Sequence, residues 1–572
     1  MKPIHNSQVA EIFEEIGDML DIQGENRFRV LAYRNAAEVI SNLTEEVQQM
    51  IVEGKDLTEL PGIGKDLAGK IEEIVKKGGS TLYKELQKKT PLSLVRLIHL
   101  QDLGPKKVAK LNKKLGIKDI DDLEKAAKAG KIAKLEGFGQ KSQEKILDAI
   151  SHFKGAAGRM RFAEAVPIVN SLVPYLEKLK GVKQVEVAGS FRRRKETVGD
   201  LDILVTGDTS SPVLNGFKKY TEIKSVLASG ETKVTVRLLS GIQVDVRFLE
   251  PKSFGAALCY FTGSKEHNVA LRNIAKKKAM KLSEYGLFKG KAMVAGKTEE
   301  EIYKKLGLEF IPPELREMRG EIEASQNKEL PTLISLQDIR GDLHMHTSAT
   351  DGANTIEDMA HAAKKLGLEY IAITDHSQGQ RQAGGLDPKA MRKHLENIRK
   401  ADASISGIKI FCGSEVDILK DGSLDYKDDL LDEMDVVVAS LHSHFTLSRA
   451  EQTKRVVKAI KSGKVTIIGH LTTRLIGTRK PVDIDVEEVL KAAKDYNVVM
   501  ESSAQPSRLD LNDIYCKMAK EMGVKIAINT DAHSVQNLAL MRFGVDNVRR
   551  GWIEKSDVFN CLPLIKLQKH LR

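Results

Sequence analysis

The strongest constraint on the fold is a repeating pattern in the C-terminal part of the chain, after residue 338. Seven short apolar runs rich in β-branched residues recur there, with helical segments between most of them. Regular alternation of strands and helices is typical of parallel sheets, because each crossover helix returns the chain to the end of the sheet at which the previous strand began. Seven units predict a parallel barrel. The runs span residues 339–343, 370–374, 408–412, 436–440, 465–468, 498–500 and 526–529.

Residues that bind metal ions lie at or just after nearly every one of these runs. The C-terminal ends of parallel strands carry the active sites of barrels, and ten of the fourteen histidines follow position 340. An isolated histidine is usually structural, but a series at successive strand ends is not explained that way. The candidates are His344, His346, Asp351, Asp375, His376, Glu415, His442, His444, His470, Asp531 and His533.

So many ligands exceed what one tetrahedral ion can use, so we expect two or three ions. A mixed set of imidazoles and carboxylates suits Mn²⁺ or Zn²⁺. Such ions activate water for hydrolysis of a phosphoester. The C-terminal region is therefore predicted to be a metal-dependent phosphoesterase.

A second predicted site lies between residues 182 and 251, where strands and helices indicate a mixed α/β domain. Its predicted strands are 182–188, 202–206, 233–239 and 242–248. Residues i and i+2 of a strand point the same way, so Asp200 and Asp202 present two carboxylates on one face. Asp245, on a later strand, could add a third. Divalent ions would offset this repulsion, and a pair of them can stabilise phosphoryl transfer.

The residues before this Asp-x-Asp pair strengthen the prediction. Asp-x-Asp alone is more often a solvated strand end. Here it follows a Gly189-Ser190 turn and a run of arginines that includes Arg193, and these groups could hold the phosphates being transferred. The combination favours a site for phosphoryl transfer.

The first 155 residues are predicted to be almost entirely helical, with amphipathic stretches at 9–20 and 29–40. A Gly-containing turn followed by a helix recurs three times and predicts helix-hairpin-helix motifs, whose backbone N–H groups and lysines grip a phosphate backbone without reading sequence. One copy alone could be an ordinary helix junction. The predicted DNA-contacting residues are Gly62, Gly64, Lys65, Gly104, Lys106, Lys107, Gly137, Gly139 and Lys141.

The charge distribution agrees with a nucleic-acid partner. Residues 1–340 carry 57 Lys and Arg against 47 Asp and Glu, whereas residues 341–572 carry 33 against 32. A basic excess of +10 in the first part favours a polyanion. No stretch approaches the ~18 consecutive apolar residues of a membrane span, and the four cysteines are far apart, so we expect a cytoplasmic protein.

The segment from Gly189 to Asp202, with Asp245, resembles the nucleotidyltransferase palm of family X DNA polymerases, the DNA polymerase beta type. The resemblance extends through Tyr260-Phe261-Thr262-Gly263-Ser264 and the N-terminal hairpins, over residues 1–317. It implies that Asp200, Asp202 and Asp245 are catalytic and bind two Mg²⁺ or Mn²⁺ ions. It also implies a nucleotide-binding set of Gly189, Ser190, Arg193, Gly199, Tyr260, Phe261, Gly263, Asn268 and Arg272.

Two of these implied roles have specific alternatives. Tyr260 and Phe261 would pack under the sugar as a filter against a 2′-hydroxyl, but without the flanking match they would be a core aromatic pair. In animal relatives a lysine of the N-terminal domain removes a 5′-deoxyribose phosphate, and the matching position is Lys70. Asp66 stands where those relatives have a phosphate-binding lysine, so a surface lysine on a DNA-binding helix has at least equal weight.

The C-terminal ligands resemble those of the PHP (polymerase and histidinol phosphatase) domain, a distorted seven-stranded phosphoesterase barrel. The resemblance implies metal binding by His344, His346, Asp351, His376, Glu415, His442, His470, Asp531 and His533. His444, two residues after His442, is a further candidate. Every expected ligand type is present, so we expect an active domain.

Together these features predict a multidomain α+β and α/β protein in six segments. They are a helix-hairpin-helix, lyase-like domain (1–90), a fingers-like helical DNA-binding domain (91–155), a nucleotidyltransferase palm (156–251), a thumb that is mainly helical (252–317), a linker (318–337) and a (β/α)7 PHP domain (338–572). The arrangement is that of bacterial and archaeal family X polymerases.

The predicted function is a DNA polymerase that fills short gaps in repair, with a metal-dependent 3′→5′ exonuclease in the PHP domain. A 3′-phosphatase or AP endonuclease activity is a further option. The expected partners are gapped or primer–template DNA and dNTPs, and we expect a nucleoid-associated monomer. Three alternatives stay open: a DNA-targeted PHP phosphoesterase with an inactive polymerase core, a non-catalytic DNA-end scaffold, and a small-molecule histidinol phosphatase, which the hairpins disfavour.

Overall fold

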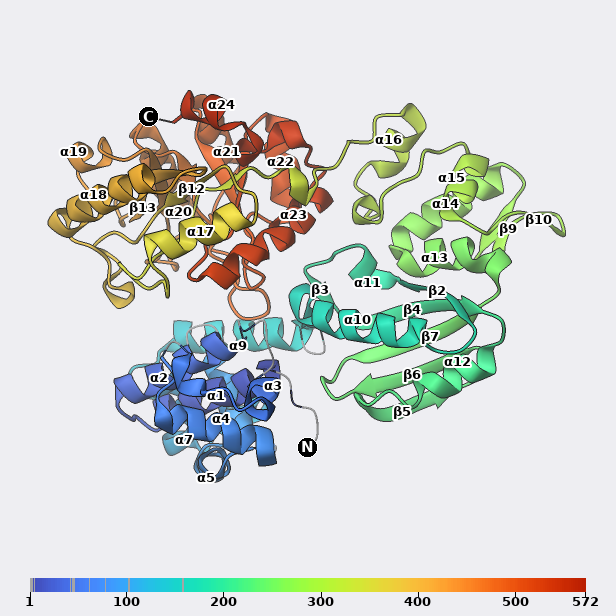
Figure 1. Ribbon diagram of the computed structural model, residues 1–572, viewed down its shortest axis with the longest axis horizontal. Coiled ribbons are helices and arrows are strands. Elements are labelled where there is room, and N and C mark those ends of the chain that lie inside the picture. Colours follow the sequence, from blue (N-terminus) through green and yellow to red (C-terminus); the bar gives the residue numbers. More distant parts are fainter. Residues whose placement is uncertain are drawn as a thin grey trace. The chain divides into compact units, whose positions relative to one another are not determined.

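The chain folds as two units, whose elements are labelled in Figure 1. The computed structural model describes residues 4, 6–41, 43, 47–60, 62–77, 79–100, 103–156 and 159–571. One unit comprises residues 1–157 with 477–480, and the other comprises residues 158–476 and 481–572. None of the helices in the described part of the chain is long and apolar enough to cross a membrane.

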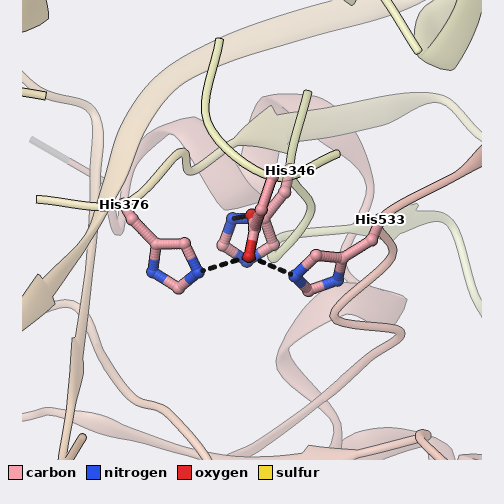
Figure 2. Close-up of side chains that lie close together, drawn as sticks. His346, His376 and His533 are labelled. Atoms are coloured by element: carbon pink, nitrogen blue, oxygen red, sulfur yellow. Dashed lines mark ion pairs between the residues drawn. The ribbon is translucent and has the colours of Figure 1, made fainter. Parts of the chain in front are cut away.

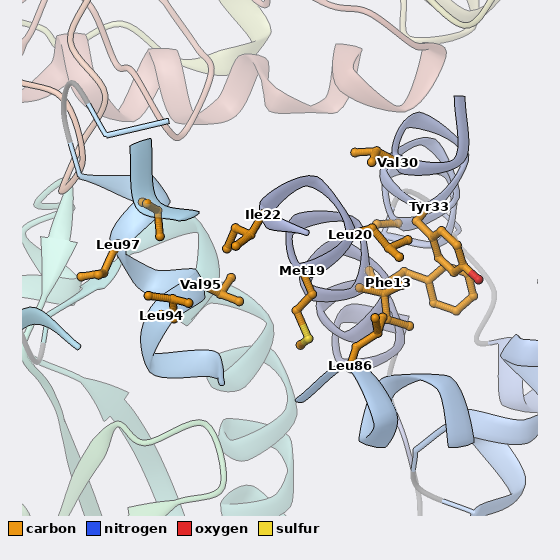
Figure 3. Packing of buried hydrophobic residues seen from close by; sticks show 14 of the residues in the cluster. Phe13, Met19, Leu20, Ile22, Val30, Tyr33, Leu86, Leu94, Val95 and Leu97 are labelled. Carbon is orange, nitrogen blue, oxygen red and sulfur yellow. The ribbon is translucent and has the colours of Figure 1, made fainter. Parts of the chain in front are cut away.

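The first unit consists of helices, as predicted. Apolar residues at helical spacing make α1 amphipathic, and its Phe13 ring packs on Tyr33 of α2 with 5.6 Å between ring centroids. Figure 3 shows these residues within the buried core, to which the later helices contribute Leu86, Leu94 and Val95. The helices are α1 (Asn6–Ile22), α2 (Arg27–Ser41), α3 (Val47–Val52), α4 (Lys65–Lys77), α5 (Thr81–Lys89), α6 (Leu92–Val95), α7 (Pro105–Leu115), α8 (Ile120–Lys128) and α9 (Gln140–Ala156).

The second unit begins with a five-stranded sheet in the order β2-β4-β7-β6-β5. Alternate residues of β4 divide between its faces: Leu201, Ile203 and Val205 pack with helices α10 and α12, whereas Leu204 packs with α13. The elements are α10 (Phe162–Glu177), β2 (Val182–Val187), α11 (Gly189–Arg192), β4 (Asp200–Gly207), α12 (Ser210–Phe217), β5 (Ile223–Ser229), β6 (Lys233–Leu238), β7 (Gln243–Leu249) and α13 (Phe254–Thr262); a short pair, β1 (Met160–Arg161) and β3 (Thr197–Val198), lies beside them.

Two parts of this region differ from the sequence prediction. Strand β5 was not predicted, because it is an edge strand whose residues 224–229 are exposed and lack an apolar alternation. Residues 252–317, predicted to be mainly helical, also contain a three-stranded antiparallel sheet whose strands are too short to give a periodic signal. The elements are α14 (Lys265–Lys277), β8 (Lys281–Ser283), β9 (Gly286–Lys289), β10 (Ala292–Ala295) and α15 (Glu299–Leu306).

The predicted linker is a folded segment. It contains α16 (Glu321–Asn327), in which Glu321, Ile322 and Ser325 are buried. Just before it, fully buried Arg316 pairs with Glu299 at 2.6 Å, and Glu321 lies 2.7 Å from the ring of His267. Ion pairs and hydrogen bonds stabilise this segment, and apolar periodicity, the signal sought in the sequence, does not reveal such contacts.

The C-terminal region is a seven-stranded parallel barrel, as predicted. Its strands follow one another in sequence order, and a parallel bridge between Met345 and Ala532 links the last strand to the first. They are β11 (Gly341–Asp342), β12 (Tyr370–Ile373), β13 (Lys409–Asp417), β14 (Val436–Ser440), β15 (Ile467–Ile468), β16 (Val499–Ser503) and β17 (Ile526–Asn529). All seven fall on the predicted runs.

The barrel helices begin at recognisable caps. The Thr355 side chain accepts from the Asp358 backbone in a capping box, Pro388 follows its N-cap Asp387, and Asn512 caps α22. The helices are α17 (Ile356–Lys365), α18 (Pro388–Ser404), α19 (Asp428–Leu431), α20 (Arg449–Lys461), α21 (Val486–Asp495), α22 (Asp513–Met522), α23 (Met541–Arg550) and α24 (Leu564–Gln568).

Candidate active sites

Three carboxylates meet on one face of the five-stranded sheet. Asp200 and Asp202 lie on β4, and Asp245 lies opposite Asp202 on the parallel neighbour β7. By the alternation of the strand, Asp200 and Asp202 share the face of Leu204, which α13 covers. The structure therefore brings the three predicted catalytic residues together.

Basic side chains partly balance these carboxylates. The Lys233 ammonium lies 2.6 Å from Asp245, and the Arg247 guanidinium lies 3.4 Å from Asp245 and 3.9 Å from Asp202. The balance is incomplete. Burial, followed by the neighbouring Asp200, still raises the pKa of Asp202 to about 6. A buried oxygen of Asp245, Oδ1, has no hydrogen-bond partner among the described residues. Oxygen donors with surplus negative charge fit Mg²⁺ or Mn²⁺.

Gly189 lets the chain pass close to the carboxylates. Its φ is +67°, and a Cβ there would lie 3.2 Å from Oδ2 of Asp202. A side chain at this position would be strained and would crowd the carboxylate. The turn that Gly189 allows opens α11, with Ser190 and Arg193 facing the same cavity as Asp200 and Asp202.

That cavity has a volume of about 880 Å³, and most of the predicted nucleotide-binding residues line it. Tyr260 and Phe261 line it, with their rings 5.1 Å apart and nearly perpendicular. The Asn268 side-chain amide donates to the backbone carbonyl of Tyr260 at 2.6 Å. Eight predicted residues line the cavity: Gly189, Ser190, Arg193, Tyr260, Phe261, Gly263, Asn268 and Arg272. The ninth, Gly199, does not line it and lies against Arg159.

The sequence reasoning missed several basic residues of this cavity. Arg159 lines it and donates to the side chain and backbone oxygens of Thr197 at 3.0 and 2.7 Å. Lys195 and Lys265 line it too, and so do Arg474 and Arg550 of the barrel. Lys195 and Lys265 lie within or directly after the segments that carry the family resemblance. No local motif marks Arg159, Arg474 or Arg550, because only the fold brings their segments to the cavity.

The barrel holds a second cluster at the C-terminal ends of its strands. Figure 2 shows His346, His376 and His533 converging. An oxygen of Asp351 lies 3.4 Å from a ring nitrogen of each of His376 and His533. These four residues offer ligand atoms within 4.8 Å of one another, which is close enough to surround one ion.

Two further groups share members with this one. His344, His346 and Asp531 form the second group, and His376, Glu415 and His442 form the third. Glu415 is central: its Oε2 lies 3.0 Å from His376, and its Oε1 lies 2.9 Å from His470. All nine predicted ligands lie in or beside these three overlapping groups, and the number of ions stays a prediction.

Buried donor atoms without hydrogen bonds support a metal site. Among the described residues, Nε2 of His344, both ring nitrogens of His346, Nδ1 of His376 and Oε1 of Glu415 have no hydrogen-bond partner. Unpartnered polar atoms in a protein interior are costly. Imidazole and carboxylate donors fit Mn²⁺ or Zn²⁺.

The electrostatics of the cluster also favour cations. Burial lowers the pKa of His376, but Glu415 and Asp351 outweigh it and raise that pKa to about 10. Burial, together with the neighbouring His533 and His376, instead lowers the pKa of His346 to about 4, so its imidazole is neutral. Neutral imidazoles bind metals, and the carboxylates that attract protons to the other rings attract divalent cations as well.

Two carboxylates that were not predicted from the sequence contact the Nδ1 atoms of candidate ligand histidines and so orient their rings. Nδ1 of His344 lies 2.8 Å from Glu501 on β16, and Nδ1 of His442 lies 2.8 Å from Asp417 on β13. With Nδ1 donating, Nε2 of each ring is left as the ligand atom. Glu501 directly follows the predicted run 498–500, so its place at a strand end was a usable signal.

Two of the initial candidates lie outside the cluster. His444 is exposed, with a φ of +56°. Asp375 is buried, but its carboxylate accepts from Thr347 and contacts Nε2 of His394 at 2.7 Å. Asp375 therefore fixes the loop that carries Asp351 instead of joining the ligand set.

The three predicted hairpins of the first unit share the same backbone hydrogen bonds at their described residues. The backbone carbonyls of Leu60, Leu100 and Leu135 each accept a hydrogen bond from the backbone N–H three residues later. The distances are 3.1, 3.1 and 2.9 Å. The carbonyls of Gly64, Gly104 and Gly139 then accept the first hydrogen bonds of α4, α7 and α9. The motifs are therefore real structural repeats.

Their glycines leave the turns open to an approaching backbone. Gly62 and Gly137 have φ values of +71° and +80°, which favour glycine. Gly64, Gly104 and Gly139 have no such constraint, and a Cβ on any of them would meet no atom of the chain within 4 Å. Lys65, Lys106 and Lys141, one or two residues after these glycines, are exposed. Small residues beside exposed lysines suit contact with phosphates.

Lys70 lies on α4, where it forms an ion pair with Asp66 one turn earlier. Its side chain is 19% exposed. Asp66, at a position where the animal relatives carry a lysine, is therefore the ion-pair partner of Lys70. The lyase role of Lys70 stays a prediction.

Sequence comparisons agree with this architecture along the whole chain. Family profiles match the helix-hairpin-helix domain at residues 4–80, a SAM-like helix-hairpin-helix tandem at 94–151, the DNA polymerase beta palm at 159–239 and thumb at 257–317, and the PHP domain at 342–505. The DNA polymerase/3′-5′ exonuclease PolX of Bacillus subtilis is 38% identical over 576 residues, covering 100% of both chains. The chain belongs to the PolX family.

Other relatives match parts of the PolX architecture. A probable phosphatase of Thermoanaerobacter sp. is 37% identical over 242 residues, which is 40% of this chain and 94% of the relative. DNA polymerase lambda of Rattus norvegicus is 24% identical over 343 residues, 55% of this chain and 56% of its own. The family X polymerase and PHP resemblances predicted from the sequence are therefore confirmed.

Proposed function

We propose that this chain is a DNA polymerase that also carries a 3′→5′ exonuclease, with synthesis in the palm and degradation in the PHP barrel. The observation that supports the proposal is that one chain of the PolX family holds two separate clusters of candidate metal ligands. A polymerase needs the carboxylate site, and a phosphoesterase needs the histidine-rich one.

In the palm, we assign Asp200, Asp202 and Asp245 to two Mg²⁺ or Mn²⁺ ions. When bound, such ions neutralise charge on the phosphates and carboxylates. Ser190 and Arg193 would hold the triphosphate of a dNTP, since they line the cavity on the side of the Gly189 turn. The aromatic pair Tyr260 and Phe261 would lie against its sugar.

In the barrel, we assign the nine ligands to two or three Mn²⁺ or Zn²⁺ ions, which supply Lewis-acid chemistry for phosphoester hydrolysis. Glu501 and Asp417 would keep the ring nitrogens of His344 and His442 aimed at the ions. The relatives named as phosphatases support this class of reaction and keep a 3′-phosphatase or AP endonuclease activity among its candidates.

The DNA partner follows from the hairpins. Three repeats with exposed lysines suit a grip on the backbones of gapped or primer–template DNA. Filling of short gaps in repair, action as a nucleoid-associated monomer, and 5′-deoxyribose phosphate removal by Lys70 are finer predictions on which this proposal does not depend.

The main competing function is a PHP phosphoesterase whose polymerase core is inactive. The test is primer extension and shortening on a gapped substrate with Mn²⁺. Asp202→Ala should abolish extension, whereas an unchanged product pattern would favour the alternative. His442→Ala should lose shortening, with His444→Ala as the matched control, because His444 lies outside the cluster.

A further inference from the structure

The palm and the barrel share a junction of charged residues, most of them buried, at the edge of the nucleotide cavity. Arg193 and Arg194 follow α11 of the palm, and Arg549 and Arg550 end α23 of the barrel. Two glutamates, Glu314 and Glu317, lie between these pairs, at the C-terminal end of the thumb. The junction therefore joins three parts of the chain that are far apart in sequence.

The four arginines form two parallel bridges. In one, Oε1 of Glu317 lies 2.9 Å from Nε of Arg193 and 3.2 Å from Nη1 of Arg550. In the other, Oε1 of Glu314 lies 3.2 Å from Nε of Arg194 and 2.9 Å from Nε of Arg549. Each glutamate thus holds one palm arginine and one barrel arginine.

Arg550 makes two contacts that Arg549 does not. Its Nη1 donates to the backbone carbonyl of Arg193 at 2.6 Å, and its Nη2 contacts Asp513 at 2.8 Å. The Arg550 side chain is only 4% exposed. Arg549 instead donates to the carbonyl of Ile334 at 2.7 Å and does not touch Arg193 in the described structure. Only one bridge, therefore, reaches the backbone that carries Arg193.

Arg193 is the residue for which this contact matters. It lines the cavity with Asp200, Asp202 and Ser190, and its guanidinium also donates to the carbonyl of Thr262. A free arginine side chain loses rotamer entropy when it binds a phosphate, so one already held in place binds more tightly. Glu317 holds the side chain of Arg193, and Arg550 holds its backbone.

We propose that Arg550 of the barrel is a positioning residue for nucleotide addition, fixing Arg193 for the triphosphate of the incoming nucleotide. The inference rests on the proposed polymerase function. It gives the barrel a role in synthesis that needs none of its metal ligands. It also predicts that separating the palm from the barrel weakens nucleotide binding.

The test is steady-state kinetics of single-nucleotide addition by the full chain. Arg550→Ala should raise KM for the dNTP about tenfold, with a smaller change in kcat, because a charged hydrogen bond that prepares the binding site is lost. Arg550→Lys should restore only part of this loss, since an ammonium cannot bridge three acceptors in the same fork. Arg549→Ala is the matched control and should leave KM within about twofold.

Two further measurements separate positioning from loss of structure. Trp552, the single tryptophan, lies two residues after Arg550, so its emission reports whether the junction is intact in each variant. In the double variant Arg193→Ala/Arg550→Ala, KM should match that of Arg193→Ala alone, because Arg550 acts through Arg193.

Three results would count against the inference. A wild-type KM in Arg550→Ala would overturn it, and equal increases in the Arg549 and Arg550 variants would show a general loosening instead. Additive effects in the double variant would mean that Arg550 does not act through Arg193. If the wild-type chain adds no nucleotide, the proposed polymerase function itself fails, and this inference falls with it.

Discussion

Replacing Asp202 by asparagine should stabilise the metal-free protein, because the ionised carboxylate is held in an unfavourable place. Burial, Asp200 and Asp245 raise its pKa from 3.8 to about 6. At 1.36 kcal/mol per pKa unit, the folded state bears a penalty of about 3 kcal/mol when Asp202 is ionised. That raised pKa already includes the attraction of Arg247, 3.9 Å away, so Asp202→Asn removes the net penalty. Because its amide stays largely buried, we expect a gain of about 1–3 kcal/mol.

The raised pKa of Asp202 determines how the stability gain of Asp202→Asn depends on pH. Above about pH 6 the carboxylate is ionised in both the folded and the unfolded chain, so the folded state bears the whole penalty. As the pH falls from about 6 towards 3.8, the folded state takes up the proton first and the penalty disappears. The advantage of Asp202→Asn should therefore be full at pH 8 and nearly absent at pH 4.

The assay is thermal unfolding in the presence of a chelator at both pH values. Asp200→Asn is the control, because Asp200 is exposed and its charge is solvated, so the change should be smaller. Adding Mg²⁺ should stabilise the wild type more than Asp202→Asn. A lower melting temperature for Asp202→Asn at pH 8, or an equal shift at both pH values, would refute the reasoning.

Three further outcomes follow from the two sites. Glu501→Gln should weaken Mn²⁺ activation of shortening about 10- to 100-fold and spare extension, because His344 and the backbone of His470 lose their carboxylate partner; an unchanged Mn²⁺ titration would contradict this. The half-saturating Mn²⁺ concentration for shortening should fall between pH 6 and 9, because Mn²⁺ must displace a proton from His376, whose pKa carboxylates raise to about 10; a flat profile would exclude that competition. Replacing Tyr260 by glycine should reduce the preference for dNTPs over ribonucleotides, measured as the ratio of their kcat/KM values. If substitutions at Tyr260 and Phe261 leave this ratio unchanged, the pair is a core aromatic pair and not a filter for the sugar.

The barrel and its cluster of candidate ligands were predictable because their signals are local. Each apolar run reports a buried strand, and a ligand at the strand end needs no knowledge of distant residues. Asp200 and Asp202 are likewise neighbours in sequence. The Gly-containing turns repeat with their helices directly after them, so the hairpins were readable too.

What the sequence did not reveal depends on contacts between distant residues. The exposed edge strand β5 has no apolar face, and the short strands of the thumb have no periodicity. The role of Glu321 in the predicted linker becomes visible only beside His267. The bridges between Arg193 and Arg550 join positions 357 residues apart, and nothing in either local sequence indicates the other.

The most direct test of two independent active sites in one chain is a single gel assay. A gapped substrate with a labelled primer is incubated with Mn²⁺, with and without dNTPs, using the wild type, Asp245→Ala and His344→Ala/His346→Ala. We expect Asp245→Ala to shorten the primer without extending it, and the double variant to extend it without shortening it. Loss of both activities in either variant, or metal-dependent shortening by the purified double variant, would contradict the account.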